Sequence, residues 1–509
     1  MVKAKQVLSG RWKIGLGTLT VLSALFFFLG YDVHFFDGPY GMHFMRQTDS
    51  LSFVYQYYND GYDFFNPKLF NLKNIEGRAA CEFPITYYFT AILYGIIGPK
   101  MYLLKLIHLI ISFSGLFYVF KLAHLVLKDY VYASLIALFL CTSTVYNFYA
   151  FNYLPDTPAL SFVLIAWYYA FKYQMNGQRN TLIKAFVFFT LGSLIKVTYL
   201  INPIALLIFY LFIYLFQRKQ LEGLKSKRSI FKYGLISLLL VFSWNAYMIH
   251  YNKQYESHSF NTTILPIWEL SKNNMIIVWE YVVDFWYTSY FAHSSFHLLI
   301  FLALVQIILI KKSNYNITLL VFLLFLGLIC FAFLFYSQFK DHDYYFLTFI
   351  PFLILLFINA INTLKIKYPN TKVHFGFKFI LILIVFVGIN YSKHKLTERR
   401  ENQMNSYSKM GLLIFRHKEE IRRLNIPKNA KIILTPETSQ NGGLLYLNRM
   451  GWTIPSLKDI THEKLIELKL KGANYLLHVS KDIQTQEKLK TEGELILECN
   501  DLYVFKLKQ

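Results

Sequence analysis

Long apolar segments dominate the 509-residue chain and restrict it to one class of fold. A helix needs about 17 to 25 mostly apolar residues to cross a lipid bilayer. Eleven segments of about this kind occur between residues 14 and 392, at 14–31, 101–127, 131–149, 158–174, 181–195, 199–216, 231–250, 293–310, 316–336, 345–361 and 377–392. Because backbone polar groups in lipid must be paired within the spanning structure, the pattern predicts an α-helical polytopic membrane protein with about 11 transmembrane helices.

The composition excludes the main soluble and fibrous classes. The chain is 55% hydrophobic and 16% charged, whereas soluble domains are about 45–50% apolar and about 25% charged. Four cysteines in a chain of this length form no disulfide framework, and we expect Cys81 and Cys499 to be free thiols. The sequence contains no Walker A loop, no GxGxxG after a strand, no HExxH and no CxxC pair.

The net charge of +22 describes orientation in a membrane better than nucleic-acid binding. With the N-terminus in the cytoplasm, the cytoplasmic loops of residues 1–392 hold 21 basic and 2 acidic residues. The outer loops hold 10 basic and 14 acidic residues. Short cytoplasmic loops carry the excess of Lys and Arg, so the sequence predicts a multi-pass protein of the cytoplasmic (inner) membrane. An odd number of spans then places the C-terminus outside, on the periplasmic side where a periplasm exists.

Three segments are predicted to lie outside the membrane. Residues 1–392 form the transmembrane domain, with long outer loops at 32–100 and 251–292. The first loop contains an amphipathic stretch, Ile85 to Gly98, that is too short to span and is expected at the membrane surface. Residues 393–509 have no spanning segment and are predicted to form a small external α/β domain.

The prediction for the tail depends on short β-type runs around one helical stretch. The β-type runs are 431–435, 475–479, 494–498 and 502–505, and the helical stretch is 461–471. Gly442-Gly443 between them is typical of a turn or a helix start.

Acidic residues on the outer face are the first candidates for chemistry. Asp49 occurs in Arg46-Gln-Thr-Asp49, Glu82 in Cys81-Glu-Phe-Pro84, and Asp156 in Pro155-Asp-Thr-Pro158. The predicted topology brings all three to the same membrane face. Carboxylates at the boundary between lipid and water are costly unless they are hydrated, paired or used. The alternative is that each is an ordinary solvated loop acid.

Basic and aromatic residues on the same face are the second candidates. Lys196 is the sole basic residue between two apolar segments, and a lone lysine in that position is a candidate functional residue. Its alternative is a lysine that extends to the membrane surface. The run Lys340-Asp-His-Asp-Tyr-Tyr345 places a base, two acids, an imidazole and two phenols beside an apolar helix. Such a cluster suits a phosphate or polar head group, or it anchors the helix at the interface.

The order of these motifs resembles that of integral-membrane glycosyltransferases of the GT-C fold. The most similar branch contains the protein mannosyltransferases and the aminoarabinose transferase of lipid A, glycosyltransferase families 39 and 83. The tail motifs Asn441-Gly-Gly-Leu-Leu-Tyr446, Arg449-Met-Gly-Trp452 and Lys471-Gly-Ala-Asn-Tyr475 are similar to the external domain of these enzymes. The resemblance covers essentially the whole chain.

The resemblance implies transfer of a sugar from a polyprenyl-phosphate donor to a lipid, glycan or protein acceptor outside the membrane, with inversion. It implies that Asp49 is the general base and that Glu82 and Asp156 shape the site. These three would hold a divalent cation (Mg²⁺ or Mn²⁺) if one is used. The residues implied to bind or surround the donor phosphate are Lys196, Arg46, His342, Asp343 and Tyr345. The chain lacks the adjacent Asp-Glu pair of the protein mannosyltransferases, which counts against a protein acceptor and a tightly bound metal.

Two other functions are compatible with a polytopic chain. A transporter or flippase of lipid-linked sugar would carry charged residues along its spans on both faces of the membrane, and the acids here gather on one face. A structural or assembly partner would depend on an external domain that binds cell-wall material. No nucleic-acid partner is expected.

Overall fold

The computed structural model describes residues 2–217, 227–260, 264–401, 408–479 and 483–508. All eleven predicted apolar segments lie on helices, which confirms the helical polytopic fold class. These helices are α1 (Val2–Phe28), α4 (Tyr102–Leu127), α5 (Tyr130–Phe139) with α6 (Thr144–Ala150), α7 (Asp156–Asn176), α8 (Arg179–Ile195), α9 (Ile201–Phe216), α10 (Lys227–Gln254), α13 (His293–Ile308), α14 (Tyr315–Leu334), α15 (Ile350–Lys367) and α16 (Thr371–Glu401).

The number of membrane spans stays a prediction. Within the described residues, six helices are long and apolar enough to cross a membrane, or up to eight if each bent pair forms one span. The first bent pair joins Tyr130–Thr142 to Thr144–Ala150 at 83°, and the second joins Lys272–Tyr290 to His293–Ile308 at 96°. The second pair contains α11 (Lys272–Glu280), the π-helical turn η6 (Tyr281–Trp286) and α12 (Tyr287–Tyr290).

The chain divides into two compact units that are not continuous in sequence. The first, here called the membrane unit, comprises Met1–Phe35, Lys105–Trp244 and Thr262–Thr397. The second, here called the loop–tail unit, comprises Phe36–Leu104, Asn245–Asn261 and Glu398–Gln509. Residues 36–104, which include most of the predicted first outer loop, therefore fold with the C-terminal tail.

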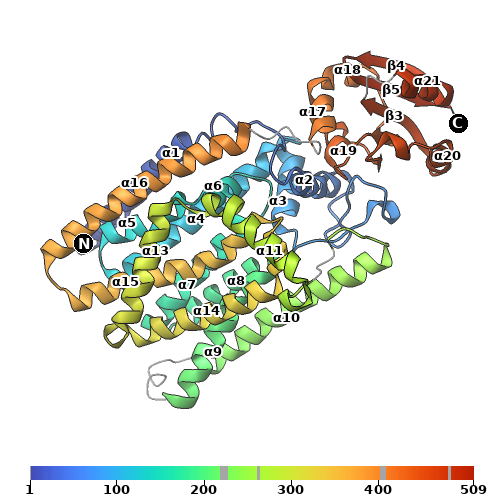
Figure 1. Cartoon of the computed structure of the whole chain (residues 1–509). Coiled ribbons are helices and arrows are strands. Elements are labelled where there is room, and N and C mark those ends of the chain that lie inside the picture. Colours follow the sequence, from blue (N-terminus) through green and yellow to red (C-terminus); the bar gives the residue numbers. More distant parts are fainter. Residues whose placement is uncertain (1, 218–226, 261–263, 402–407, 480–482, 509) are drawn as a thin grey trace. The chain divides into compact units, whose positions relative to one another are not determined.

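Helices of the membrane unit run side by side as a bundle (Figure 1). Helix α7 packs on α8, α13 on α15, and α14 on both α9 and α15. Small residues permit the closest approaches, as is common between membrane helices. A Cβ at Gly115 of α4 would lie 2.5 Å from the Ser161 side chain of α7. A Cβ at Gly192 of α8 would lie 2.7 Å from Val163 of α7.

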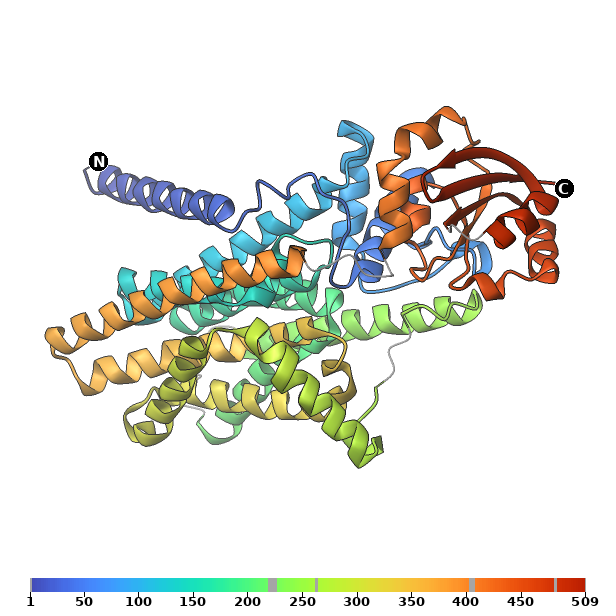
Figure 2. The ribbon, with the colours of Figure 1, turned by 45° about the horizontal axis from the view of Figure 1, so that its top comes forward.

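The loop–tail unit is built on a five-stranded sheet with the order β2-β1-β3-β5-β4. Its strands are β1 (Lys431–Thr435), β2 (Gly451–Thr453), β3 (Ala473–Val479), β4 (Gly493–Cys499) and β5 (Leu502–Leu507). Strand β1 runs parallel to β2 and β3, whereas β5 is antiparallel to β3 and β4. Figure 2 shows this sheet with its helices at the red end of the chain.

Helices complete the tail, and the small C-terminal α/β fold is confirmed. They are α17 (Lys409–Arg416), α18 (Lys418–Arg423), α19 (Gly442–Leu447), α20 (His462–Leu470) and α21 (Ile483–Glu492). The four predicted β-type runs lie on β1, β3, β4 and β5, and the predicted helix corresponds to α20. Strand β2 was not predicted, because three residues are too few to show alternation.

The first outer loop contributes α2 (Phe44–Asn59) and α3 (Ile85–Ile97) to the loop–tail unit. Helix α3 coincides with the predicted amphipathic stretch. It buries Tyr87 and Tyr94 and exposes Phe89, Ile92 and Ile96. The loop also extends the sheet, because the Leu72 N–H donates to the Gly451 carbonyl at 2.7 Å and the Gly451 N–H donates to the Phe70 carbonyl at 3.0 Å. The loop and the tail are thus one hydrogen-bonded structure.

We predict that Gly451→Ala destabilises the loop–tail unit. An alanine Cβ there would lie 1.9 Å from the Ile432 carbonyl oxygen in the neighbouring parallel strand. Backbone must move to relieve that overlap, at a cost of about 1–3 kcal/mol. The measurement is the unfolding temperature of the detergent-solubilised full chain. Gly376→Ala is the matched control, because no atom lies within 4 Å of its added Cβ. Equal unfolding temperatures for the two variants would contradict the prediction.

Candidate active site

Three predicted site residues meet within the loop–tail unit. Arg46 and Asp49 are one turn apart on α2, and Glu82 precedes α3. The Arg46 Nη2 donates to both carboxylate oxygens of Glu82, at 2.9 and 3.0 Å. The Arg46 Nη1 lies 3.8 Å from the Asp49 Oδ2. Arg46 therefore stands between the two carboxylates and balances part of their charge.

Aromatic residues hold this cluster in place. The Tyr87 hydroxyl donates to the Glu82 Oε1 at 2.6 Å and lies 3.0 Å from the Ser50 hydroxyl. The Arg46 guanidinium lies 4.8 Å from the centre of the Phe260 ring. Such contacts restrict the rotamers of Arg46 and Glu82, and side chains held in one position favour catalysis.

Asn441 from the tail holds the remaining side of Asp49. Its Nδ2 donates to the Asp49 Oδ1 at 2.8 Å, and its Oδ1 accepts from the Asn71 backbone N–H at 3.0 Å. The second bond sets which end of the amide faces Asp49. Asn441 is fully buried and directly precedes α19.

The turn before α19 is fixed by a buried acid. The Glu437 carboxylate accepts from the backbone N–H groups of Ser439 at 2.8 Å and Gly443 at 3.3 Å. Burial raises the pKa of Glu437 to about 8, although these two hydrogen bonds oppose the rise. The turn places the Asn441 side chain where it donates to Asp49.

The environment of Asp49 suits a base that works near neutral pH. Its side chain is 14% exposed. Burial raises the pKa of the Asp49 carboxyl to about 6, a rise that Arg46 and the Asn441 hydrogen bond oppose and Glu82 increases. A general base is most effective when its pKa lies near the working pH. Asp49 thus combines ionisation at neutral pH with more basicity than a solvated aspartate.

A second group of predicted residues meets within the membrane unit. Asp156 is the first residue of α7, where the helix dipole favours negative charge. Lys196 follows the last residue of α8. The Lys196 Nζ lies 2.8 Å from the Asp156 Oδ1, with side chains 22% and 6% exposed. Lys196, the sole basic residue between its two apolar segments, is therefore the partner of a nearly buried acid.

Two tyrosines cover Lys196, and both belong to the run at 340–345. The Lys196 Nζ lies 4.6 Å from the centre of the Tyr344 ring and 4.9 Å from that of Tyr345. The fully buried Asp343 accepts from the Tyr149 hydroxyl at 2.7 Å. The His342 ring lies edge-on to the Tyr344 ring and tilted to the Tyr345 ring, with ring centres 5.2 and 5.6 Å away. Asp343, Tyr344 and Tyr345 begin the 3-10 helix η9 (Asp343–Phe349), and His342 directly precedes it.

The predicted residues thus fall into two groups, one in each compact unit. Arg46, Asp49 and Glu82 form the first group, and the membrane unit holds the other five. The sequence did not indicate the contributions of Asn441, Tyr87, Tyr149 and Tyr344. Asn441 and Tyr344 lie inside motifs that were noted, but neither had a pattern that assigned it a partner. The role of each residue in catalysis stays a prediction.

The residues predicted to hold a divalent cation do not form a ligand set. In the part of the chain that the structure describes, no three His, Cys, Asp or Glu side chains gather around a common point. Asp49 and Glu82 share Arg46, and Asp156 belongs to the other unit and pairs with Lys196. Oxygen ligands for Mg²⁺ would have to leave these cations first.

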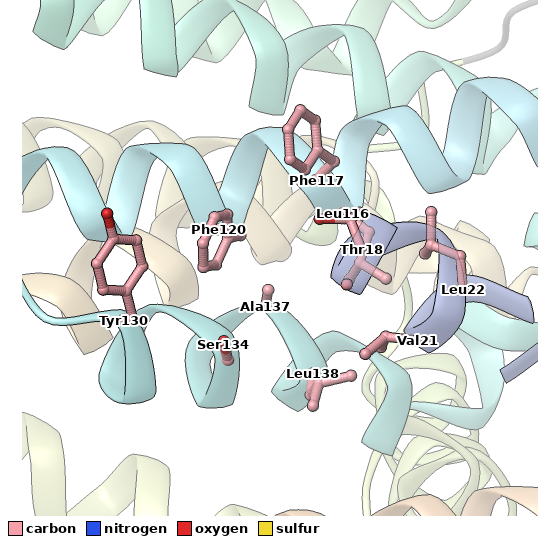
Figure 3. A pocket seen from close by; sticks show the side chains of 11 residues that line it. Thr18, Val21, Leu22, Leu116, Phe117, Phe120, Tyr130, Ser134, Ala137 and Leu138 are labelled. Atoms are coloured by element: carbon pink, nitrogen blue, oxygen red, sulfur yellow. The ribbon is translucent and has the colours of Figure 1, made fainter. Parts of the chain in front are cut away.

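An apolar hollow of about 310 Å³ lies elsewhere in the membrane unit, between α1, α4 and α5 (Figure 3). Its lining includes Thr18, Val21, Phe117, Phe120 and Leu138 and no charged side chain. It has the size and polarity for part of a hydrocarbon chain, and it lacks groups for sugar transfer.

Known proteins resemble this chain in fold more than in sequence. Residues 82–247 match the family model of dolichyl-phosphate-mannose-protein mannosyltransferase. No curated protein sequence matches the chain. Apo ArnT from Cupriavidus metallidurans has a TM-score of 0.60 at 11% identity, over 97% of this chain and 98% of that one. The same protein bound to undecaprenyl phosphate has a TM-score of 0.56 at 10% identity, with the same coverages.

An archaeal enzyme extends the likeness. The oligosaccharyltransferase of Archaeoglobus fulgidus, tethered with an acceptor peptide, has a TM-score of 0.54 at 10% identity, over 91% of this chain and 69% of that one. The chain has the GT-C fold. This GT-C protein is a multi-pass membrane protein, and its fold is that of membrane glycosyltransferases.

Proposed function

We infer that the protein is a glycosyltransferase that moves a sugar from a polyprenyl-phosphate donor to a lipid, glycan or protein acceptor. The observation that carries this proposal is Asp49, a carboxylate with a raised pKa held by Arg46 and Asn441 on a GT-C scaffold. Undecaprenyl phosphate in ArnT supports the donor class. The acceptor peptide of the archaeal enzyme supports a protein acceptor, whereas the missing Asp-Glu pair favours a lipid or glycan.

In the proposed reaction Asp49 acts as the general base. A sugar hydroxyl is a weak nucleophile, and a carboxylate that accepts its proton lowers the barrier. The acceptor oxygen forms a bond to the anomeric carbon as the bond from that carbon to the phosphate oxygen breaks. The proton moves to Asp49, and the bonding electrons leave with polyprenyl phosphate. One displacement of this kind inverts the anomeric configuration.

Lys196 is proposed to stabilise the leaving phosphate. A cation aimed at charge that develops in the transition state lowers the barrier most in a site with little water. The Tyr344 and Tyr345 rings keep Lys196 poorly hydrated, and Asp156 orients its ammonium. His342, Asp343 and Tyr345 are proposed to line the same head-group region, with Asp343 fixed by Tyr149.

The reaction is proposed to take place on the outer face of the cytoplasmic membrane. Contacts within the membrane unit support this topology, because residues assigned to one face meet one another. At the cytoplasmic face, Lys378 pairs with Asp129 at 2.6 Å and the Lys365 Nζ donates to the Leu127 carbonyl at 2.6 Å. At the outer face, Lys196 pairs with Asp156. The tail is proposed to be external because an odd number of spans places it on the face opposite the cytoplasmic N-terminus.

A purified transfer assay tests the proposed function. The full chain in nanodiscs is incubated with a set of polyprenyl-phosphate sugars and with lipid and glycan extracts as acceptors. The expected result is a product one sugar heavier by mass spectrometry, together with free polyprenyl phosphate. Movement of the intact donor across liposomes without a product would instead support a flippase. Mass spectrometry of cell-envelope glycans and lipids after gene inactivation then identifies the acceptor.

We predict that kcat/KM falls about tenfold per pH unit below about pH 6. Only ionised Asp49 can accept the proton, and protonation removes the base as pH falls through its pKa. Asn441→Ala removes a hydrogen bond that favours the charged form, so this acidic limb should move to higher pH. Asn59→Ala is the control, because it removes an exposed amide contact at the end of α2. Superimposable profiles for Asn441→Ala and wild type would exclude this role for Asp49.

A further inference from the structure

A pocket of about 370 Å³ in the loop–tail unit has no part in the site described above. It opens between α18, the segment that follows it, strand β1 and the end of α19. Its apolar lining includes Tyr446 and Leu447, which are both partly exposed. The pocket has both apolar and charged lining residues. This combination suits a sugar that carries an ionised group better than it suits a small inorganic ion.

The charged groups of the pocket are all cationic. Lys418, Arg422 and Arg449 line it, and no acidic residue does. Lys418 and Arg422 have the spacing i, i+4, which places them on one face of α18, and Asn425 lies just after the end of that helix. The exposed Arg422 has a loose contact to Glu419, with 3.9 Å between Nη1 and Oε2. Lys418 has no carboxylate partner among the described residues and lies 5.0 Å from the Phe415 ring centre.

Arg449 lines this pocket and is held by hydrogen bonds to backbone carbonyls. Its Nε and Nη2 donate to the carbonyls of Pro427 at 2.8 Å and Ile426 at 2.7 Å, and its Nη1 donates to the Asn448 carbonyl at 2.9 Å. Within the described residues no carboxylate lies within ion-pair distance of it. Partial burial lowers the pKa of Arg449, as expected for a cation without a counter-ion. A bound anion would supply the missing charge.

Helix α19 connects the pocket to the candidate base. Its last residues, Tyr446 and Leu447, line the pocket, and Asn441 directly before it donates to Asp49. Six helical residues span about 9 Å. An extended molecule held at the pocket can therefore reach the region of Asp49.

We propose that this pocket binds a phosphate or carboxylate group carried by a saccharide acceptor. The proposal rests on the proposed glycosyltransferase function and assigns the acceptor a negative charge. Cations at the pocket bind that charge, and the partly exposed Tyr446 and Leu447 contact the sugar. A hydroxyl elsewhere on the same acceptor then meets Asp49.

The test measures binding of glucose 1-phosphate to the full chain in phosphatidylcholine nanodiscs by titration calorimetry, with glucose as the neutral probe. Lys418→Gln/Arg422→Gln removes two exposed charges from the pocket. Lys464→Gln/Lys471→Gln removes two exposed charges from the region of α20 and is the matched control. We expect Kd for glucose 1-phosphate to rise about tenfold in the pocket variant and to stay unchanged in the control. Glucose should show no difference between the two variants.

Two outcomes would overturn the proposal. One is an equal Kd in the two double variants. The other is loss of glucose 1-phosphate binding in nanodiscs enriched in phosphatidylglycerol, which would assign the pocket to a lipid head group. Asp49→Asn separates this proposal from the proposed reaction, because it should bind glucose 1-phosphate with wild-type affinity. Binding of glucose 1-phosphate by the wild-type chain, together with no transfer in the purified assay, would support the pocket and reject only the reaction.

Discussion

Asp49→Asn should reduce the rate of sugar transfer by about 100- to 10,000-fold, the contribution typical of a general base. The substitution keeps the size of the side chain and one oxygen that can accept from the Asn441 Nδ2. It removes the group that accepts the acceptor proton. The measurement is kcat in the purified assay, with insertion and unfolding temperature measured in parallel. We expect stability to be retained, because a buried charge is removed from a site that disfavours it.

Asp60→Asn is the matched control for this variant. Asp60 follows the last residue of the same helix α2 and pairs with Lys68 at 2.6 Å. Because that pair is partly exposed, its loss should change neither rate nor stability measurably. Full activity of Asp49→Asn would reject Asp49 as the base.

Lys196→Met should reduce transfer by about 100- to 1,000-fold, the loss typical when one electrostatic contact to the transition state is removed. The methionine keeps the apolar stem that lies against Tyr344 and Tyr345 and removes the ammonium. It also leaves the nearly buried Asp156 without its partner, which costs about 3 kcal/mol or more. A single variant therefore mixes lost catalysis with lost stability.

The double variant Asp156→Asn/Lys196→Met separates these two effects. It removes both charges of the pair, so the unfolding temperature should return toward that of the wild type while transfer stays low. Lys184→Met on the same helix α8 is the control, because Lys184 is exposed and its ammonium lies 5.5 Å from the centre of the Tyr169 ring. Recovery of transfer in the double variant would show that Lys196 acts only by balancing Asp156.

The sequence predicted local structure well, because hydrophobic length and alternation are local properties. The run at 431–435 is strand β1 residue for residue, and Ile85 to Gly98 coincides with α3 except for its final glycine. Several predicted candidate residues also have a partner of opposite charge. Lys196 has an acid beside it, and Arg46 lies between Glu82 and Asp49.

Long-range partners could not be predicted for a physical reason. Asn441 donates to a residue 392 positions earlier, and no periodicity links two such distant segments. The same holds for Gly451, which exchanges backbone hydrogen bonds with Phe70 and Leu72. Backbone bonds of this kind leave no trace in side-chain pattern. The grouping of the first outer loop with the tail therefore required the three-dimensional structure.

The contact between Asn441 and Asp49 also has a consequence for biosynthesis. The chain is made from its N-terminus, so the helix that carries Asp49 is complete long before residue 441 leaves the ribosome. Until then the carboxylate has no amide partner, and the edge of the sheet beside Phe70 and Leu72 does not exist. A chain truncated before residue 441 therefore lacks the amide that donates to Asp49. If Asp49 is the base, as proposed, we expect full activity only after the tail has been synthesised and has folded with residues 36–104.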